Sequence, residues 1–282
     1  MVVLLSTFDY SRCEWFSQEG ENPPFDKYSF LPYNKTNIYF NYNLQKGILT
    51  MNKIGIIGAM DEEVAGLKKD MTVTTTTTIA SMEFLEGTIL GKNVVVVRSG
   101  IGKVNAAVCA EILAGIFKAD AIINTGIAGS LNAKIDIGDI VISSDVLHHD
   151  MDATGFGYPL GQIPRMEVLS FEADKTLINT AKEVCEKVNP EIHTHIGRVV
   201  SGDQFISDKD VKNKIVTNFE GYCTEMEGAA IAQTAYLNKI PFVILRAISD
   251  KADDSATVDY PTFEKKAIEH SVNLVKGMLE KL

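Results

Sequence analysis

From residue 53 onward, short apolar runs alternate with longer amphipathic stretches. Near-continuous aliphatic runs are typical of strands buried on both faces, and amphipathic stretches with helical spacing are typical of the helices that cover them. The pattern predicts one α/β domain of about 230 residues with a mostly parallel sheet covered on both faces. The expected strands are residues 54–57, 94–98, 121–125, 139–143, 195–200 and 241–247, and the expected helices are residues 62–69, 103–117, 175–187, 228–237 and 262–282. Residues 72–78, six threonines and one valine, are expected to form a surface strand or loop.

Residues 1–50 differ from the rest of the chain. They contain 11 of the 23 aromatic residues, and no helical or alternating apolar period persists in them. They lack the basic start and the apolar core of a secretory signal peptide. We expect a poorly ordered or non-native N-terminal extension followed by a functional domain at residues 51–282. The alternative is a small arm that docks on a partner through its aromatic side chains.

The composition excludes several classes of protein. Of the 282 residues, 45% are hydrophobic and 23% are charged, as in ordinary soluble proteins. The net charge of −10 argues against nucleic acid as a partner, because phosphate binding needs clustered lysine and arginine. No apolar run is long enough to span a bilayer, and an acidic surface disfavours anionic membranes. We expect a soluble, cytoplasmic protein.

The cysteines and histidines do not show the spacing of a metal site. The four cysteines are far apart and form no CxxC pair, so we expect reduced, mostly buried thiols. Neither histidine pair has carboxylates at helical spacing nearby, so surface or core histidines are expected and no metal is predicted. The residues in question are Cys13, Cys109, Cys185, Cys223, His148, His149, His193 and His195.

Two glycine-rich segments follow predicted strands, where ligands bind in α/β sheets. Residues 55–63 have the spacing G-x-x-G and lack the third glycine of a dinucleotide-binding turn. Residues 99–104 resemble a phosphate-binding loop, but this loop requires glycine at position 97 and serine or threonine at position 104, and both positions are valine here. A tight turn that lets backbone approach a ligand remains possible at both, and also at residues 124–129.

Three acidic residues, Asp61, Glu62 and Glu63, begin the first predicted helix. Acids in a first turn complement the helix dipole, and this explains most such clusters. Because three are more than the dipole needs, one of them is a candidate base.

Two further acidic segments are candidates for chemistry. In an extended chain, Glu225 and Glu227 would lie on one face with Met226 opposite. Like charges this close need a sugar diol, a cation or full solvation. Asp250 beside Ser249 follows the strand predicted at residues 241–247, where an acid with a raised pKa can donate a proton. A helix N-cap is the alternative for either residue.

These motifs, in this order, resemble the bacterial 5′-methylthioadenosine/S-adenosylhomocysteine nucleosidases of the purine nucleoside phosphorylase superfamily. The resemblance runs from residue 51 to residue 282 through IGIIGAMDEEV, SGIGKVNAA, NTGIAGS, GDIVIS, SGDQFI, EMEGAAIAQ and RAISDKAD. It implies a three-layer αβα sandwich around a mixed, twisted sheet, a homodimer, and no cofactor or metal. The implied reaction hydrolyses the N-glycosidic bond of these adenosine thioethers to adenine and a thioribose, in methionine salvage and S-adenosylhomocysteine removal.

The resemblance also implies roles for the candidate residues. Asp250 would protonate N7 of adenine, with Ser249 steadying its side chain and Arg246 tuning and positioning it. Glu63 would activate the attacking water, and Glu227 would accept hydrogen bonds from the ribose hydroxyls.

Other residues are expected to surround the substrate. By resemblance, the substrate-binding set comprises Ala59, Ile101, Ala128, Gly129, Phe205, Ile206, Glu225, Met226 and Glu227. Met226 would pack on the ribose, Phe205 and Ile206 would hold the adenine, and Ile101 would line the thioalkyl path. Phe156, Tyr158 and Pro164 would reach across a dimer interface into the neighbour's 5′-pocket. Ile127 replaces a serine of the family's glycine-rich turn.

Two alternatives remain open at this point. A phosphorolytic relative would use phosphate in place of water, but it needs cationic groups around the anion, and little arginine stands near these turns. A non-catalytic nucleoside-binding protein on the same fold would not need both Glu63 and Asp250.

Overall fold

The computed structural model of the protein describes residues 51–282. The predictions made for residues 1–50 and for Cys13 therefore lie outside the described residues. The strands of the described part are β1 (Lys53–Gly58), β2 (Thr72–Ile79), β3 (Met82–Ile89), β4 (Lys92–Arg98), β5 (Ala121–Ser130), β6 (Ile140–His148), β7 (Phe171–Glu172), β8 (Thr194–Ser201), β9 (Cys223–Glu225) and β10 (Phe242–Asp250). Its helices are α1 (Asp61–Lys69), α2 (Lys103–Gly115), α3 (Lys175–Val188), α4 (Lys209–Phe219), α5 (Gly228–Asn238) and α6 (Ala256–Lys281), with a short 3-10 helix at Thr154–Phe156.

The strands pair into one mixed sheet in the order β10-β6-β8-β9-β5-β1-β4-β3-β2, with β7 beside β6. Because β10 also pairs with β5, the strands β5, β10, β6, β8 and β9 form a closed ring, and β1, β4, β3 and β2 extend from it. Five strand pairs are parallel and five are antiparallel. The prediction of a mostly parallel sheet is therefore wrong, because apolar runs report burial on both faces and not strand direction. The mixed sheet implied by the family resemblance is confirmed.

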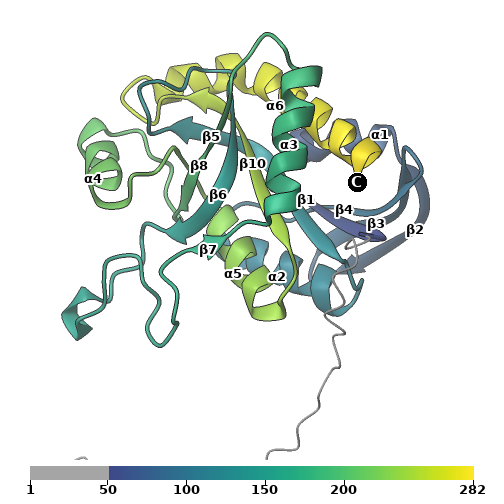
Figure 1. Ribbon diagram of the computed structural model, residues 1–282, viewed down its shortest axis with the longest axis horizontal. Helices are drawn as coiled ribbons and strands as arrows, with labels where there is room; N and C mark the ends of the chain where they lie inside the picture. The colour runs from purple at the N-terminus through teal and green to yellow at the C-terminus, as the bar shows by residue number, and fades with distance from the viewer. Residues whose placement is uncertain (1–50) are drawn as a thin grey trace, which may run out of the picture. The chain divides into compact units, whose positions relative to one another are not determined.

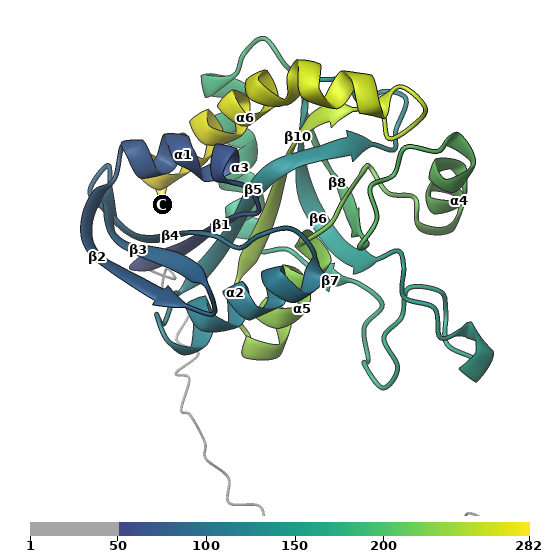
Figure 2. The same cartoon turned by 180° about the vertical axis from the view of Figure 1, so that it is seen from behind.

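Helices cover both faces of this twisted sheet (Figures 1 and 2). Alternate residues of β4 point to opposite faces: Val95 and Val97 pack in the core under α2 and α5, and Val94 and Val96 in the core under α1, α3 and α6. This alternation explains why the strand reads as a continuous apolar run. The molecule is a three-layer αβα sandwich, as the resemblance implied.

Several strands are longer than the apolar pattern predicted, and the extensions of β5 and β10 carry site residues. β5 was expected to end at Thr125 in a glycine-rich turn, but it continues to Ser130 with every residue buried. β10 was expected to end at Ala247 and continues to Asp250, also buried throughout. Each extension is paired with a neighbour in the closed ring, and this pairing satisfies backbone groups that a turn would expose.

The remaining differences are at the ends of elements or in short elements. α6 begins at Ala256 rather than at residue 262 and contains Pro261, which the pattern predicted to stand outside the helix. Strands β3, β7 and β9 and helix α4 were not predicted. Residues 72–78 form the exposed edge strand β2, one of the two predicted alternatives.

The described cysteines are free and buried, as predicted: Cys109, Cys185 and Cys223. Among residues 51–282, no three side chains of His, Cys, Asp or Glu are grouped as a metal ion would need. Of the histidines, His148 and His149 are buried in the core, and His195 contacts Asp139 at 3.1 Å. None of the described helices combines the length and the apolar character needed to cross a bilayer.

Candidate active site

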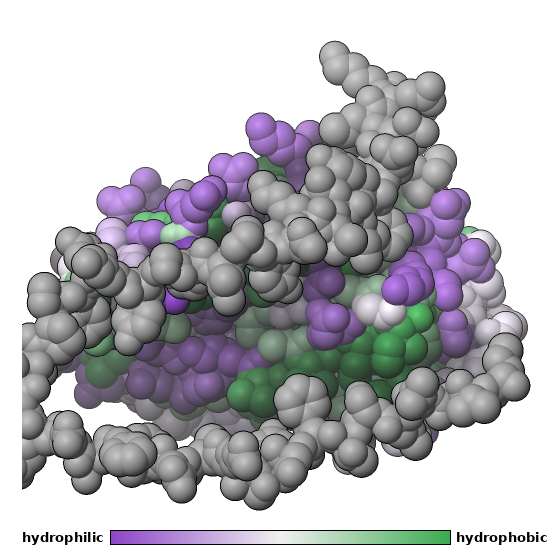
Figure 3. Space-filling view, turned by 90° about the horizontal axis from the view of Figure 1, so that it is seen from below, coloured by the Kyte–Doolittle hydropathy of each residue, from purple (hydrophilic) through white to green (hydrophobic). Residues whose placement is uncertain are grey.

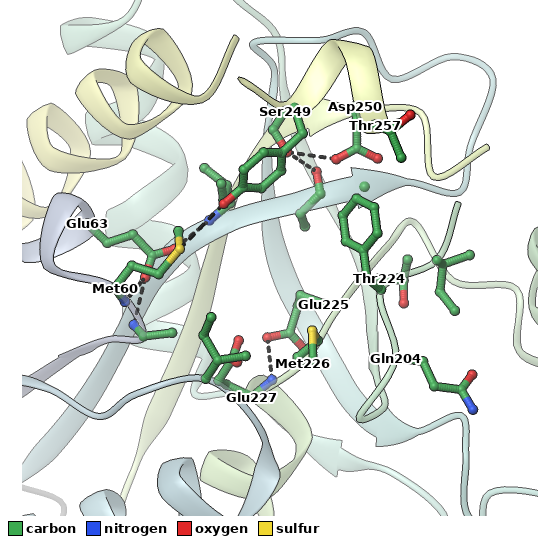
Figure 4. A pocket seen from close by; sticks show the side chains of 18 of the residues that line it. Met60, Glu63, Gln204, Thr224, Glu225, Met226, Glu227, Ser249, Asp250 and Thr257 are labelled. Carbon is green, nitrogen blue, oxygen red and sulfur yellow. Dashed lines mark hydrogen bonds between the residues drawn. The ribbon is translucent and has the colours of Figure 1, made fainter. Parts of the chain in front are cut away.

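One cavity of about 600 Å³ lies beyond the ends of β1, β5, β9 and β10 (Figure 4). It contains thirteen of the residues singled out in the sequence: Ala59, Glu63, Ile101, Ile127, Ala128, Gly129, Phe205, Ile206, Glu225, Met226, Glu227, Ser249 and Asp250. Six further residues complete its lining: Met60, Gln204, Thr224, Thr257, Tyr260 and Pro261. Segments far apart in the chain therefore meet at a single place.

The register of the closed ring explains this meeting. Gly129 of β5 pairs with Asp250 of β10 on one side and with Thr224 of β9 on the other. A Cβ atom at Gly129 would lie 2.8 Å from Oδ1 of Asp250 and 2.7 Å from the Cβ of Ala252, so no larger residue fits there. The missing side chain leaves space for the carboxyl group of Asp250 at the edge of the cavity.

Glu63 is buried, whereas the neighbouring Asp61 and Glu62 are exposed. Its Oε2 accepts hydrogen bonds from the backbone N–H groups of Ala59 (2.6 Å) and Met60 (3.0 Å), and its Oε1 accepts one from Ile127 (3.2 Å). Burial raises the pKa of Glu63, while Arg246 and these three amides oppose the rise. The helix dipole accounts for the exposed Asp61 and Glu62. The buried Glu63 carboxylate is held in one orientation by three backbone N–H groups, as a general base would be.

Asp250 lies across the cavity from Glu63 (Figure 4). Ser249 Oγ donates a hydrogen bond to Oδ2 of Asp250 (2.8 Å), and the N–H of Ala252 donates one to Oδ1 (2.7 Å). Burial raises the pKa of Asp250 despite these two donors. Neither Ser249 nor Asp250 is a helix N-cap, because α6 begins after Ser255. A carboxyl group with this environment can retain a proton and donate it.

Arg246 does not hold Asp250, and that part of the sequence prediction is wrong. Its Nη2 donates to Oε2 of Glu225 and to Oδ1 of Asn124, and its Nη1 donates to the carbonyl of Leu245. Regular strand alternation would put residues 246 and 250 on the same face, but the pairing with β5 shifts register between Ile248 and Asp250. Arg246 is buried and is not part of the cavity lining, so it lies behind the cavity wall. There it supplies a positive charge close to the buried glutamates.

Glu225 and Glu227 are not two residues of one extended strand, because β9 ends at Glu225 and Glu227 is the N-cap of α5; Met226, expected on the opposite face, lines the same cavity. Glu225 ends β9 and accepts hydrogen bonds from Arg246, from Ser201 Oγ and from the N–H of Gly228 (2.7 Å). Although burial raises the pKa of Glu225, Arg246 and these donors lower it below its usual range. The cation that was one of three explanations for the acid pair is therefore Arg246 itself. Glu225 supports the site from below and is not a free acceptor.

Glu227 is the N-cap residue of α5 and turns toward the loop before α2. Its Oε1 accepts a hydrogen bond from the N–H of Gly102 (2.8 Å). Burial and the neighbouring Glu225 raise the pKa of Glu227 to about 8. Its second carboxylate oxygen has no such partner among the described residues, and the side chain lines the cavity (Figure 4).

The apolar part of the cavity includes Phe205 and Ile101, each about half exposed. The ring of Phe205 meets that of Tyr260 edge-on, with centroids 6.1 Å apart. Two aromatic rings at right angles at a cavity mouth can hold a flat heterocycle by stacking.

Phe156, Tyr158 and Pro164 are outside this cavity. Phe156 is 87% exposed, on the loop that projects from the body of the molecule between β6 and β7 (Figure 1). The chain therefore does not bring these three residues to its own site.

Sequence reasoning missed Thr257, Tyr260 and Pro261, because the last helix was predicted to begin only at residue 262. Pro261 lies six residues into α6, so the first turns of this helix enter the cavity. Met60 and Gln204 were within the quoted motifs and could have been found there. No sequence signal identified Thr224 beyond its place beside Glu225.

The cavity lining contains no lysine, arginine or histidine among residues 51–282. Arg246 is buried below it, and Arg98 is partly exposed in an ion pair with Asp61 (3.1 Å). A site lined by four carboxyl groups and by neutral side chains has no cationic anchor for a phosphate ion.

Comparisons with known proteins agree with this architecture. The sequence model of the phosphorylase superfamily matches residues 53–280. A 5′-methylthioadenosine/S-adenosylhomocysteine nucleosidase of an Exiguobacterium species is 43% identical over 231 residues, which cover 82% of this chain and 98% of that protein.

Two solved structures of nucleosidases with the same name are similar throughout the described domain. The Neisseria meningitidis protein, in complex with methylthio-immucillin-A, has a TM-score of 0.79 and 38% identity and covers 82% of this chain and 100% of its own. The Colwellia psychrerythraea protein, in complex with adenine, has a TM-score of 0.79 and 40% identity and covers 82% of this chain and 96% of its own. The chain thus belongs to the phosphorylase superfamily and, within it, to the 5′-methylthioadenosine/S-adenosylhomocysteine nucleosidases.

Proposed function

We propose that this protein hydrolyses the N-glycosidic bond of 5′-methylthioadenosine and S-adenosylhomocysteine, releasing adenine and the corresponding thioribose. The observation that carries the proposal is that Glu63 and Asp250, two buried carboxyl groups with raised pKa values, line one cavity from opposite sides. An acid and a base on either side of the bond, with room for water between them, are what inverting glycoside hydrolysis requires.

Asp250 is the general acid in this proposal. Cleavage of the bond builds negative charge on the purine, and a proton delivered to N7 neutralises it. Burial raises the pKa of Asp250, and this favours the protonated form that a general acid needs. Ser249 Oγ and the N–H of Ala252 fix the carboxyl group in the plane where the base would lie.

Glu63 is the general base that removes a proton from the attacking water. Three backbone N–H groups hold its carboxylate in a fixed orientation, so water bound to it would be aligned for attack. Arg246, beneath the floor, opposes the effect of burial on the pKa of Glu63 and so favours the ionised form that a base needs.

The substrate is expected to lie between these two groups. Glu227 accepts hydrogen bonds from the ribose hydroxyls, and the positive charge that develops on the ribose is stabilised by the carboxylates around it. Phe205 and Ile206 hold the adenine, Met226 packs on the ribose, and Ile101 lines the path of the 5′-thioalkyl group. Each of these assignments is supported by the position of the residue in the cavity wall.

Hydrolysis is favoured over phosphorolysis because the described cavity lining lacks a cationic side chain. A phosphorylase would need such groups around its anion. A protein that only binds nucleosides would have no need for two buried carboxyl groups whose pKa values are raised.

We also propose that the protein is a cytoplasmic homodimer formed through the face made by α2 and α5. A groove of about 380 Å³ runs between these helices, and Val104, Ile116 and Leu237 are exposed on them. Figure 3 looks onto this side of the molecule and shows hydrophobic side chains gathered on part of it. In such a dimer, Phe156, Tyr158 and Pro164 would complete the 5′-pocket of the neighbouring subunit.

The decisive test is adenine release from 5′-methylthioadenosine in phosphate-free buffer, followed by chromatography. Hydrolysis gives the free thioribose at the same rate with and without phosphate. Release that depends on phosphate would replace hydrolysis by phosphorolysis, and binding without release would leave only a nucleoside-binding role.

A further inference from the structure

A chain of charged contacts ties three loops together beside the proposed ribose site. Nζ of Lys103, the first residue of α2, contacts both carboxylate oxygens of Asp150 at 2.7 and 2.8 Å. Asp150 stands two residues after the end of β6. The two side chains are only 20% and 18% exposed, so solvent screens this pair less than an open surface pair.

The same residues are bound to the end of β8 through Asp203. Oδ2 of Asp150 accepts a hydrogen bond from the N–H of Asp203 (3.0 Å), and Oδ1 of Asp203 accepts one from the N–H of Lys103 (2.8 Å). Lys103 is thus held at its side chain by one aspartate and at its backbone by the other. Although burial raises the pKa of Asp150, Lys103 and the N–H of Asp203 lower it below its usual range, so the carboxyl group is ionised at neutral pH.

This cluster is adjacent to the group that fixes Glu227. The residue before Lys103 is Gly102, whose N–H donates to Oε1 of Glu227 (2.8 Å). Gly102 has φ +95°, a conformation that strongly favours glycine, and a Cβ there would lie 3.2 Å from Oδ1 of Asp203. The direction of the Gly102 N–H therefore depends on how Lys103 and Asp203 are held.

We propose that Lys103 and Asp150 are positioning residues for Glu227. They hold the loop before α2 so that the Gly102 N–H orients the Glu227 carboxylate toward the ribose hydroxyls. Asp203 also precedes Gln204, Phe205 and Ile206 of the cavity wall, so the same contacts tie the ribose side of the site to the adenine side. This inference rests on the proposed function, because it assigns the residues by what Glu227 does to the ribose.

The test compares 5′-methylthioadenosine with its 2′-deoxy analogue in Lys103→Met and Asp150→Asn. If the pair positions Glu227, each variant lowers kcat/KM for the ribonucleoside about tenfold and changes that for the 2′-deoxy analogue less than about twofold. The double variant is no worse than either single variant, because both remove one contact. Lys103→Arg, which keeps the positive charge, retains most of the wild-type preference for 5′-methylthioadenosine over its 2′-deoxy analogue.

Lys53→Met is the matched control, since it breaks the Lys53–Glu86 ion pair (3.2 Å) at the start of β1. It should leave unchanged the ratio of kcat/KM for 5′-methylthioadenosine to kcat/KM for the 2′-deoxy analogue. Asp150→Asn is nearly isosteric and decides the matter if Lys103→Met fails to fold. An equal loss for both nucleosides, or additive losses in the double variant, overturns the positioning role.

The wild-type protein separates this inference from the proposed function. Release of adenine by wild type together with an unchanged ratio in the variants overturns the inference alone. If wild type releases no adenine, the proposed function fails. The positioning role is then tested by calorimetric Kd values for 5′-methylthioadenosine and its 2′-deoxy analogue. A ratio of these two Kd values that is the same in the variants as in wild type overturns the positioning role.

Discussion

Arg246 and Glu225 form an ion pair beneath the floor of the cavity, with side chains only 2% and 3% exposed. The pair comes from β10 and from the end of β9, on either side of β5 in the closed ring. Arg246 is also the positive charge that opposes the raised pKa values of Glu63 and Glu227. One buried guanidinium thus balances several carboxyl groups from different parts of the chain.

Removing Arg246 should therefore destabilise the protein strongly. Arg246→Met leaves Glu225 without its partner, and breaking a buried pair in this way costs about 3–5 kcal/mol. Urea denaturation measures the free energy of unfolding. The double variant Arg246→Met/Glu225→Gln should recover part of the loss, and a double variant as unstable as the sum of the single ones would contradict the pairing.

Glu63→Gln and Asp250→Asn should fold normally and lose adenine release. Neither amide can exchange the proton that its carboxyl group handles, and loss of general acid or base catalysis costs about 10²- to 10⁴-fold. Single-turnover release of adenine is the measurement. Glu62→Gln, an exposed acid in the same helical turn as Glu63, serves as control and should keep wild-type activity. Near-normal turnover in either test variant removes that residue from the mechanism.

Gly126→Ala should disturb Glu63 without touching the substrate. A Cβ at Gly126 would lie 2.6 Å from Oε1 of Glu63 and 3.3 Å from Nη1 of Arg246. Because three backbone amides fix the carboxylate, it cannot move without losing one of them, and a displacement of about 1 Å can cost about 100-fold in rate. Steady-state kcat reports the effect.

The control for this substitution is Gly155→Ala, where a new Cβ meets no atom within 4 Å. Unaltered kcat in Gly126→Ala would mean that the orientation of Glu63 is not critical.

The pKa of Glu227 predicts a pH-dependent stability. In the folded protein this pKa is about 8, and in an unfolded chain a glutamate titrates near ~4.3. Between these values the folded state keeps a proton that the unfolded state has released, so this group lowers the free energy of unfolding as pH rises. Glu227→Gln removes this pH-dependent contribution. The Tm of the variant minus the Tm of wild type should therefore increase from pH 5 to pH 8.

We expect this relative gain to be at least about 2–4 °C, the shift that ~1 kcal/mol produces in a protein of this size. Differential scanning calorimetry at the two pH values measures it. Glu83→Gln, on an exposed strand position, is the control and should show no pH-dependent difference. A constant Tm difference across this range would show that Glu227 is not protonated in the folded state.

The α2–α5 face predicts the behaviour of a surface variant. Leu237→Asp places a charge in the groove between these helices, where Leu237 is 63% exposed in the single chain. If a second copy covers the groove, the variant should become monomeric in analytical ultracentrifugation and lose activity on 5′-thioalkyl substrates. Leu90→Asp alters a similarly exposed leucine, at 59%, outside this face and should leave the assembly intact. A wild-type protein that sediments as a monomer would refute the dimer.

The local pattern of the chain was sufficient for most helices and strands. Runs such as Val94–Val97 and the amphipathic stretch of α3 are determined by which residues avoid water, and this property is local. Every residue of the predicted substrate-binding set lines the cavity. Composition and spacing did not predict strand direction, because burial on both faces is the same for parallel and antiparallel neighbours.

The tertiary structure decided where the polar groups pair. Residues 124–129 were predicted to form a glycine-rich turn after a strand, yet they are part of β5, which pairs with β10 and at its end with β9. The family resemblance implied that Arg246 positions Asp250, but in the fold Arg246 donates to Glu225 at the end of β9 and to Asn124 of β5.

Sequence by itself therefore determined the type of most elements and most of the residues that line the cavity. The closed ring of strands decided which buried charges are neighbours, as Arg246 and Glu225 show. Only the tertiary structure showed that Pro261 lies inside α6 and lines the cavity. The physical reason is that hydrophobic periodicity is a property of neighbours along the chain, whereas a buried carboxyl group takes its pKa and its partners from segments that may be more than a hundred residues away.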